Sequence, residues 1–188
     1  MNVHHKTAAD LHAELEVIEQ AKKNPARFAV LYEKYFRPVF VFIHRRTGNE
    51  ELTADIVSGT FLKAMLSLDK YVFRGVPFSA WLFRIAINEV NLHYRRNSRE
   101  RTVSLEQSDL SRMISDTGEQ DSLENQQVLL KAMEKLAADD IQLLELRYFE
   151  KRPFAEVGEI LGISENNAKV RTYRIIDKLK VIFTKSNS

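Results

Sequence analysis

The sequence contains no cysteine, which excludes disulfide bonds, thiol catalysis and zinc sites built from cysteine ligands. Only 6 glycines and 4 prolines occur, and no segment alternates between apolar and polar residues as a strand would. Long uncharged apolar runs are absent and residues 1–10 are polar, so we expect no membrane insertion and no signal peptide. These absences favour an all-α protein of the cytoplasm.

Hydrophobic residues make up 44% of the chain, which is enough to build one core or two small ones. The formal net charge is only +2, so the chain is not a bulk polycation. Any affinity for nucleic acid must therefore come from local clusters of Lys and Arg.

Helical spacing of the apolar residues predicts a series of helices separated by short breaks. The first begins after Asp10, and Asn24-Pro25 resets the chain into the second. The remaining expected helices cover residues 50–68, 81–96, 123–136 and 139–150, with a loop at 69–79. Between them, residues 99–122 are rich in Ser, Asp, Glu and Thr and have no hydrophobic periodicity, which indicates a flexible linker. The predicted organisation is thus a helical domain at 1–98, a linker at 99–122 and a second helical domain at 123–188.

Residues 154–180 have the pattern of a helix-turn-helix. Gly162 is placed to end the first helix in the left-handed conformation, and Ser164 is placed to cap the second. Gly158 lies inside the first helix, where glycine costs about 1 kcal/mol relative to alanine, which would be consistent with a close crossing of the two helices.

The second helix of this motif separates into an apolar side and a basic side. We expect Ala168, Thr172, Ile175, Ile176, Leu179, Ile182 and Phe183 to pack. The opposite stripe and its neighbours are the candidate readers of duplex DNA: Asn166, Asn167, Lys169, Val170, Arg171, Tyr173, Arg174 and Lys178. A solvated basic face that binds nothing is the alternative interpretation.

The helix expected at 81–96 carries apolar residues on two sides with a polar stripe between them. The stripe consists of Arg84, Asn88, Asn91 and Arg95, and it runs into further arginines at 96, 99 and 101. Such a cluster would attract a phosphate backbone while the amides meet bases, unless it is only the solvated edge of a packed helix. Glu89 falls within one apolar stripe, and the pattern does not explain it.

The loop before this helix mixes Tyr71, Phe73, Phe78 and Trp81 with Arg74. Aromatic side chains beside an arginine can hold an unstacked base, although they could equally close a hydrophobic core. In the helix at 50–68 we expect Ala54, Val57, Phe61, Ala64, Met65 and Leu68 to face one way. Asp55, Ser58, Leu62 and Leu66 face elsewhere, which suggests a contact with another protein or with a further helix.

Taken together, these segments resemble the extracytoplasmic-function (ECF) sigma factors, a group of the sigma-70 family of bacterial transcription initiation factors. The resemblance rests on FAVLYEKYF, TADIVSGTFLKA, FRGVPFSAWLFRIAINEV, LELRYFEKRPFAEVGEILGIS and KVRTYRIIDKL, in that order. It covers nearly the whole chain.

The resemblance implies two promoter contacts. The first domain would bind the minus-ten element through Phe73, Arg74, Arg84, Asn88, Asn91, Arg95 and Arg96, with Asn88 and the 73–74 loop holding a flipped base. The second domain would bind the minus-thirty-five element through its basic helix. Leu92 stands where members commonly have Asp, and Ala137 replaces a common proline.

The resemblance further implies that core RNA polymerase is the main partner, through its β′ clamp helices and β flap. Asp55, Ser58 and Leu62 would contact the clamp, although Ser58 and Gly59 depart from the Gln-Glu usual there. An anti-sigma factor that covers these surfaces is also expected. The acids of the linker, among them Asp116 and Asp121, could occupy a basic channel of the polymerase or simply be solvated.

Two other functions stay open at this point. A stand-alone helix-turn-helix regulator would bind DNA without polymerase, although it would need only one DNA-reading surface per subunit. An enzyme acting on nucleic acid would need a metal cluster, a phosphate-binding loop or an activated nucleophile, and the sequence has none of these patterns. We therefore expect no catalytic residues, no metal site and no cofactor, and a monomer when the protein is free.

Overall fold

A computed structural model describes residues 7–97, 107–118 and 120–186, and within these ranges the chain forms helices and no strand. The chain divides into two compact units, residues 1–104 and 105–188. The prediction of an all-α fold with two small helical domains is confirmed. Arg99, Arg101, Glu106 and Glu119 lie outside the described residues, as do the side chains of Arg96 and Asp109.

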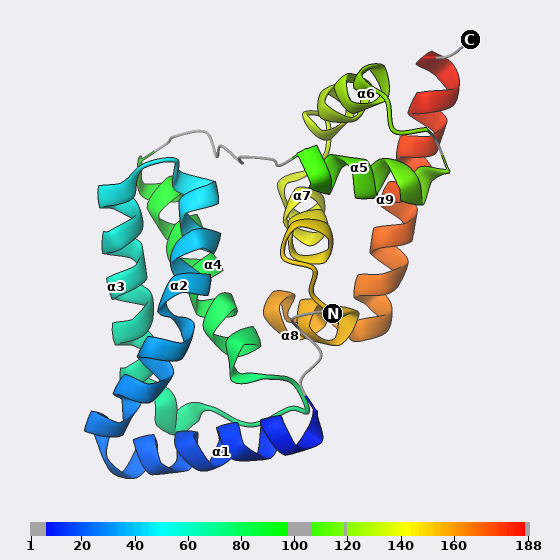
Figure 1. The fold of residues 1–188 in the computed structure, drawn as a ribbon. Helices are drawn as coiled ribbons and strands as arrows, with labels where there is room; N and C mark the ends of the chain where they lie inside the picture. The colour runs from blue at the N-terminus through cyan, green and yellow to red at the C-terminus, as the bar shows by residue number, and fades with distance from the viewer. Residues whose placement is uncertain (1–6, 98–106, 119, 187–188) are drawn as a thin grey trace. The chain divides into compact units, whose positions relative to one another are not determined.

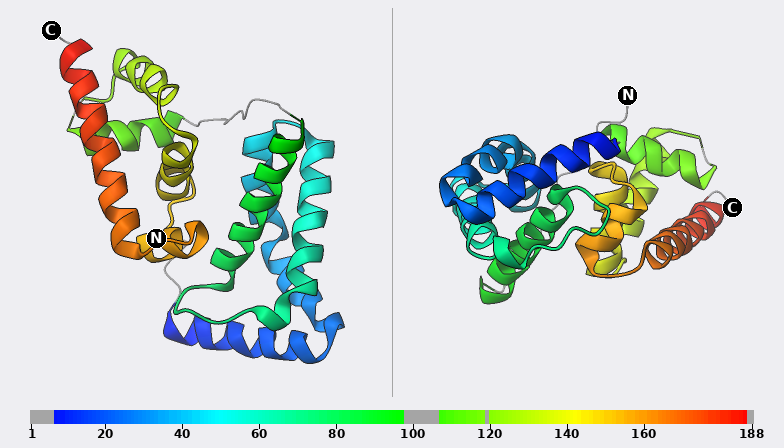
Figure 2. Two further views of the ribbon diagram at one scale, coloured as in Figure 1. Left: turned by 180° about the vertical axis from the view of Figure 1, so that it is seen from behind. Right: turned by 90° about the horizontal axis from the view of Figure 1, so that it is seen from below.

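The first unit consists of four helices, shown from blue to green in Figure 1: α1 (Ala8–Lys23), α2 (Phe28–Thr47), α3 (Glu50–Leu66) and α4 (Phe78–Asn97). Two short 3₁₀ turns, η1 (Pro25–Arg27) and η2 (Leu68–Lys70), lie between them. The helices α2, α3 and α4 stand side by side, and α1 crosses one end of this group (Figures 1 and 2). The fourth helix begins at Phe78, three residues before the expected start.

Capping residues set the boundaries of these helices. Thr7 and Asp10 form a reciprocal capping box at the start of α1, and the Asn49 side chain accepts a hydrogen bond from the Leu52 N–H at the start of α3. Gly48 ends α2 with φ 60°, a left-handed conformation that a residue without a Cβ adopts at little cost. Residues 47–49 therefore combine the end of one helix with the start of the next.

Large apolar side chains from all four helices fill the core of the first unit. Ile18, Leu31, Phe42, Phe78 and Phe83 are among those almost completely removed from solvent. Each such burial contributes about 1.5–3 kcal/mol to the hydrophobic free energy. The packing corrects one expectation for α3, since Ala54 and Met65 are exposed while Val57, Phe61, Ala64 and Leu68 are buried.

The second unit contains a helix that the sequence analysis assigned to the linker. It consists of α5 (Gln107–Thr117), α6 (Leu123–Met133), α7 (Ala138–Leu144), the π-helical turn η3 (Glu145–Phe149), α8 (Phe154–Leu161) and α9 (Glu165–Ser186). Leu110, Met113 and Ile114 of α5 are buried, and this short i, i+3, i+4 stripe is hidden in the sequence by its polar surroundings. The assignment of all of 99–122 to a linker is therefore wrong for the segment that forms α5.

Polar contacts also tie α5 to the rest of the second unit. The Tyr148 hydroxyl donates to Asp116 Oδ2 at 2.7 Å, and Arg112 Nη1 donates to the Tyr148 carbonyl at 3.2 Å. Asp121, just after α5, accepts from Gln126 Nε2 at 2.8 Å. Hydrogen bonds from the Ser111 and Gln126 side chains hold the pKa of Asp121 below its usual value. Asp116 and Asp121 are thus engaged within the unit, whereas the sequence analysis left them as linker acids.

No helix within 7–97, 107–118 and 120–186 is long and apolar enough to cross a membrane. The same part of the chain holds no group of three or more His, Asp or Glu side chains placed to bind a metal ion.

Candidate nucleic-acid interface

The turn between α8 and α9 has the geometry that the sequence predicts. Gly162 ends α8 with φ 69°, and the Ser164 side chain accepts from the Asn167 N–H at 3.1 Å to cap α9. A Cβ added to Gly158 would lie 2.8 Å from the Ile163 carbonyl oxygen and 3.1 Å from the Glu165 nitrogen. Gly158 is therefore required by the close approach of the turn backbone and of Glu165, the first residue of α9.

The predicted apolar side of α9 is the packed side. Ala168, Thr172, Ile175, Ile176, Leu179 and Phe183 are buried, and Ile182 is half-buried. Asn166, Asn167, Lys169, Tyr173, Arg174 and Lys178 are exposed on the remaining surface. The first half of α9 thus presents amides, cations and one aromatic ring together at the surface of the unit.

Arg171 is the exception among the predicted DNA-reading residues. It is half-buried, and its Nη2 lies 3.1 Å from Oδ1 of Asp140 in the first turn of α7. The sequence analysis did not single out Asp140, because the pairing joins positions 31 residues apart. The ion pair holds the guanidinium at the edge of the exposed surface of α9.

An aromatic and cationic stack supports the same end of α9. The ring of Tyr173, which is 53% exposed, lies 6.3 Å from the ring of Phe154 at the start of α8. The guanidinium of Arg147 lies over the ring of Phe154, 4.6 Å from its centroid. On either side of Phe154 in the sequence, Arg152 and Glu156 form a buried ion pair at 2.6 Å. These contacts fix the start of α8 against the exposed half of α9.

In the first unit, residues from both of the expected apolar sides of α4 are buried: Leu82 and Ala86 from one side, and Phe83, Ile87 and Val90 from the other. Along the polar stripe between them, Asn88 and Arg95 are exposed while Arg84 and Asn91 are half-buried. The four side chains recur at intervals of three or four residues, so they form one continuous strip along the helix.

The loop before α4 divides its aromatic residues between two environments. Tyr71 and Phe78 are buried and Trp81 is half-buried, and the three rings contact one another at centroid distances of 5.3–5.4 Å. These three rings close the core, so of the two interpretations of the aromatic cluster the hydrophobic core is the one that holds for them. Phe73, 39% exposed, and Arg74 remain at the surface of the loop.

Glu89, which the sequence pattern left unexplained, has a structural role between α3 and α4. Its Oε1 accepts from Lys63 Nζ at 2.5 Å, and its Oε2 lies 3.8 Å from the position of a Cβ on Gly59. A larger acidic residue at position 59 would bring a second carboxylate toward Glu89. The small residue at position 59 therefore leaves the Glu89 carboxylate without a second carboxylate beside it.

The outer face of α3 exposes apolar side chains next to a carboxylate. Leu62 is 53% exposed and Leu66 is 72% exposed, and Asp55 lies on the same side of the helix. The Ser58 hydroxyl donates to the Ala54 carbonyl at 2.8 Å, so it is already bonded within its own helix. All three candidate contact residues on α3 are exposed, and Ser58 is the one that is bonded within its own helix.

An aromatic ladder on α2, which the sequence analysis missed, contacts α3 through one of its rings. Tyr32, Phe36, Phe40 and His44 stack at successive turns, with ring centroids 5.3–5.9 Å apart. Tyr32 also contacts Phe61 of α3 at 4.7 Å. The spacing of four residues was the available signal, but it matches that of core positions, and only the packed structure shows that Tyr32 and Phe36 stay exposed.

The two units match two parts of one family. The family model for Sigma-70 region 2 matches residues 31–100, and the model for Sigma-70 region 4 matches residues 126–179. The chain is 29% identical over 183 residues to the ECF RNA polymerase sigma factor BldN of Streptomyces coelicolor, covering 94% of this chain and 69% of BldN. This chain belongs to the ECF group of the sigma-70 family. It is an RNA polymerase sigma factor.

Further similarities agree with this membership. The ECF RNA polymerase sigma factor SigM of Bacillus subtilis is 27% identical over 158 residues, covering 82% of this sigma factor and 94% of SigM. The solved structure of CnrH in complex with the cytosolic domain of CnrY has the same fold, with a TM-score of 0.58 at 20% identity, over 92% of this chain and 98% of CnrH. Membership in a family of non-enzymatic initiation factors supports the expectation that this sigma factor is not an enzyme.

Proposed function

We propose that this sigma factor binds core RNA polymerase, recognises a minus-ten and a minus-thirty-five promoter element, and promotes DNA melting. The observation that carries the proposal is that each of its two units has its own exposed strip of amides and cations. One strip lies on α4 of the first unit, and the other lies on the first half of α9. A regulator that binds DNA alone needs one such surface per subunit.

The strip on α9 is suited to duplex DNA. A helix with exposed amides and cations fits the major groove, where Asn and Arg form paired hydrogen bonds to base edges. Lys169, Arg174 and Lys178 add affinity for phosphates that weakens as the salt concentration rises. This unit would therefore bind the minus-thirty-five element.

The strip on α4 is suited to an opened strand. Asn88 and the exposed Phe73 and Arg74 belong to neighbouring elements, and an aromatic ring, a guanidinium and an amide together can stack on and hydrogen-bond an unpaired base. Arg84 and Arg95 would attract the phosphates on either side. Holding a flipped base supplies free energy for melting, and polymerase performs the chemistry.

The apolar face formed by Leu62, Leu66, Tyr32 and Phe36, with Asp55 beside it, is the proposed contact with the β′ clamp helices. Exposed leucine and aromatic side chains next to a carboxylate suit a partner helix that carries both apolar and basic residues. The second unit would contact the β flap. An anti-sigma factor would cover the same apolar face. The sigma factor RpoE from Bartonella quintana, which has a similar fold, was crystallised in complex with the anti-sigma factor NepR.

Co-purification with bacterial core polymerase, followed by run-off transcription from a genomic fragment library, tests the proposal. Stable binding with new start sites is the expected result and supplies a promoter for further work. Changing Arg171 and Arg174 together to Ala should then reduce upstream protection and transcription while polymerase binding is unchanged. Absence of polymerase binding, with specific footprints from the protein alone, would instead establish a stand-alone regulator.

A further inference from the structure

The strongest unexplained feature of the first unit is a carboxylate buried in α1. Glu14 is 4% exposed, although it lies on a helix whose other acids, Asp10, Glu16 and Glu19, are exposed. Removing a carboxylate from water is costly unless hydrogen bonds and a nearby cation compensate. The contacts of Glu14 therefore indicate what its burial achieves.

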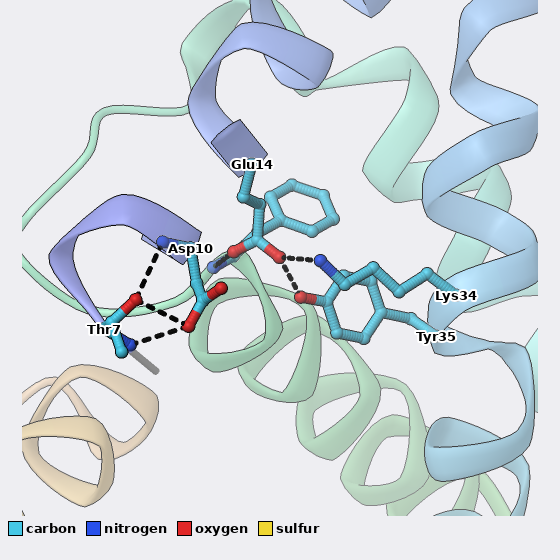
Figure 3. A network of polar contacts seen from close by, with 6 residues as sticks. Thr7, Asp10, Glu14, Lys34 and Tyr35 are labelled. Carbon is cyan, nitrogen blue, oxygen red and sulfur yellow. Dashed lines mark hydrogen bonds and ion pairs between the residues drawn. The ribbon is translucent and has the colours of Figure 1, made fainter. Parts of the chain in front are cut away.

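Both carboxylate oxygens of Glu14 are used, and they bind different elements (Figure 3). Oε1 accepts from Lys34 Nζ at 2.8 Å and from the Tyr35 hydroxyl, both on α2. Oε2 accepts from the backbone N–H of Phe78 at 2.8 Å, across 64 residues of sequence. A single side chain thus links α1, α2 and the start of α4.

The hydrogen bond from Phe78 to Glu14 is made by the backbone N–H of the first residue of α4. The N–H groups of a first helical turn have no partner within the helix, and a negative charge there is favourable. The ring of Phe78 is fully buried between Tyr35 and Tyr71, at centroid distances of 5.9 and 5.3 Å. Glu14 and these rings together determine where α4 begins.

A second residue of α1 holds the other end of the same loop. Lys22 Nζ donates to the carbonyl of Tyr71 at 3.3 Å, and it also pairs with Glu19 at 2.8 Å. Positions 14 and 22 are about two helical turns apart, so the two side chains reach from the same side of α1. The segment between the anchored Tyr71 and Phe78 contains the exposed Phe73 and Arg74, and it runs along α1 in Figure 1.

We infer that α1 is a brace for the base-binding loop, with Glu14 and Lys22 as positioning residues that fix the two ends of residues 72–77. The brace holds Phe73 and Arg74 in register with Asn88 before DNA arrives. Because the loop is already ordered before the strands open, DNA binding does not have to supply the entropic cost of ordering it. More of the interaction free energy is then available to hold the flipped base. Neither residue touches DNA in this arrangement. The inference rests on the proposed function, because it needs a holoenzyme that opens a promoter.

Two variants, each with a control, test the brace in the full-length holoenzyme. Glu14→Gln keeps the size of the side chain but has only one acceptor oxygen, so either the Phe78 N–H or the Lys34 and Tyr35 donors must face an amide N–H, and the link between α2 and α4 is broken. Its control is Lys34→Met, which removes a partner of Oε1 and leaves Oε2 in place. Lys22→Met removes the donor to Tyr71, and Glu19→Gln is its control, since Glu19 contacts Lys22 but not the loop.

The measurements are core polymerase affinity, the rate of open-complex formation on a promoter selected with the wild-type protein, and affinity for the single-stranded minus-ten oligonucleotide of that promoter. We expect Glu14→Gln and Lys22→Met to lower the opening rate and the oligonucleotide affinity by about tenfold, as for loss of a hydrogen bond to a charged group. Polymerase affinity and upstream protection should stay at the wild-type level, and both controls should open the promoter normally.

Wild-type opening rates in both variants would overturn the brace, and so would a loss of polymerase affinity that accounts for the loss of opening. If circular dichroism shows that Glu14→Gln does not fold, Lys22→Met alone decides, since the Lys22 side chain is only partly buried, with 21% of its surface exposed, and methionine keeps its apolar stem. A wild-type protein that fails to bind polymerase at all would reject the proposed function instead, before any variant is compared.

Discussion

The guanidinium of Arg171 in α9 lies 3.1 Å from the carboxylate of Asp140 in α7. Both side chains are only partly exposed, so the pair restricts the rotamers of an arginine at the edge of the candidate DNA surface. A partly exposed pair of this kind contributes less than about 1 kcal/mol to folding stability. Its larger effect should be on how the recognition helix binds DNA.

Asp140→Asn should raise affinity for any duplex and lower the preference for the specific one. Removing the carboxylate leaves Arg171 without its ion-pair partner and removes a negative charge that repels phosphates. We expect the ratio of specific to non-specific affinity to fall by about fivefold or more, which corresponds to the lower limit of about 1 kcal/mol for one oriented base contact. Fluorescence anisotropy with matched and scrambled upstream duplexes measures this ratio.

Asp139→Asn is the matched control, since Asp139 is exposed, adjacent and equally charged. It should change both affinities alike and keep their ratio. If Asp140→Asn behaves in the same way as this control, the ion pair has no role in specificity.

Asp55→Arg should weaken binding to core polymerase without unfolding the first unit. The side chain is exposed beside Leu62, so the folded structure tolerates the change, while a basic partner surface would be repelled. We expect at least about a tenfold loss of affinity, as for reversal of an interfacial charge. Glu16→Arg makes the same change of charge on the exposed side of α1 and should bind polymerase normally. Equal affinities for the two variants would reject the assignment of the clamp contact to α3.

Gly158→Ala should destabilise the second unit by about 1–3 kcal/mol, since its Cβ would lie 2.8 Å from the Ile163 carbonyl oxygen and the backbone of the turn must move. Gly59→Ala is the comparison within a helix of the first unit, where the nearest atom to the new Cβ is 3.8 Å away. That substitution should be neutral or stabilising by up to about 1 kcal/mol, because alanine is the better helix former. Thermal unfolding of the two variants should therefore shift in opposite directions or differ clearly in size, and equal shifts would contradict the close approach at the turn.

Tyr148→Phe should change how the stability of the second unit depends on alkaline pH. Burial, together with the hydrogen bond to Asp116, raises the pKa of the Tyr148 phenol. The unfolded chain then releases this proton first, so the contribution to stability is fully present below about pH 10, the ordinary pKa of tyrosine, and is lost as the pH rises above it. Denaturant unfolding between about pH 8 and pH 11 should show a shallower decline for Tyr148→Phe.

The same variant should be less stable by about 1 kcal/mol at neutral pH, because Asp116 loses a hydrogen bond. A slope for Tyr148→Phe equal to that of the wild type would mean that the phenol is not held by α5 in solution.

Local signals in the sequence were sufficient for the helix-turn-helix. A glycine at position 162 and a serine at position 164 act within one turn of chain, and the apolar period of α9 depends only on the helix itself. The polar strip on α4 followed from the same periodicity. The α5 helix was missed because its apolar residues are few and surrounded by polar ones, and their burial depends on contacts with α6 and α9 that are remote in sequence.

Glu14 shows why other site residues could not be assigned in advance. Its position, three residues after Leu11 and four before Ile18, placed it on the apolar face of α1, and that irregularity was the available signal. Nothing local shows that its partners are Lys34, Tyr35 and the N–H of Phe78. Likewise, the spacing of Tyr32 and Phe36 is equally compatible with a core and with an exposed ladder.

By itself the sequence determined the helical class, the turn of the DNA-binding motif and the family, because helix periodicity, caps and ordered motifs are properties of neighbouring residues. The tertiary structure decided which aromatic rings stay at the surface, which carboxylate pairs with Arg171 and how α1 holds the loop before α4. Each of those outcomes depends on burial and on hydrogen bonds between positions 20 or more residues apart, and such partners meet only when the helices pack.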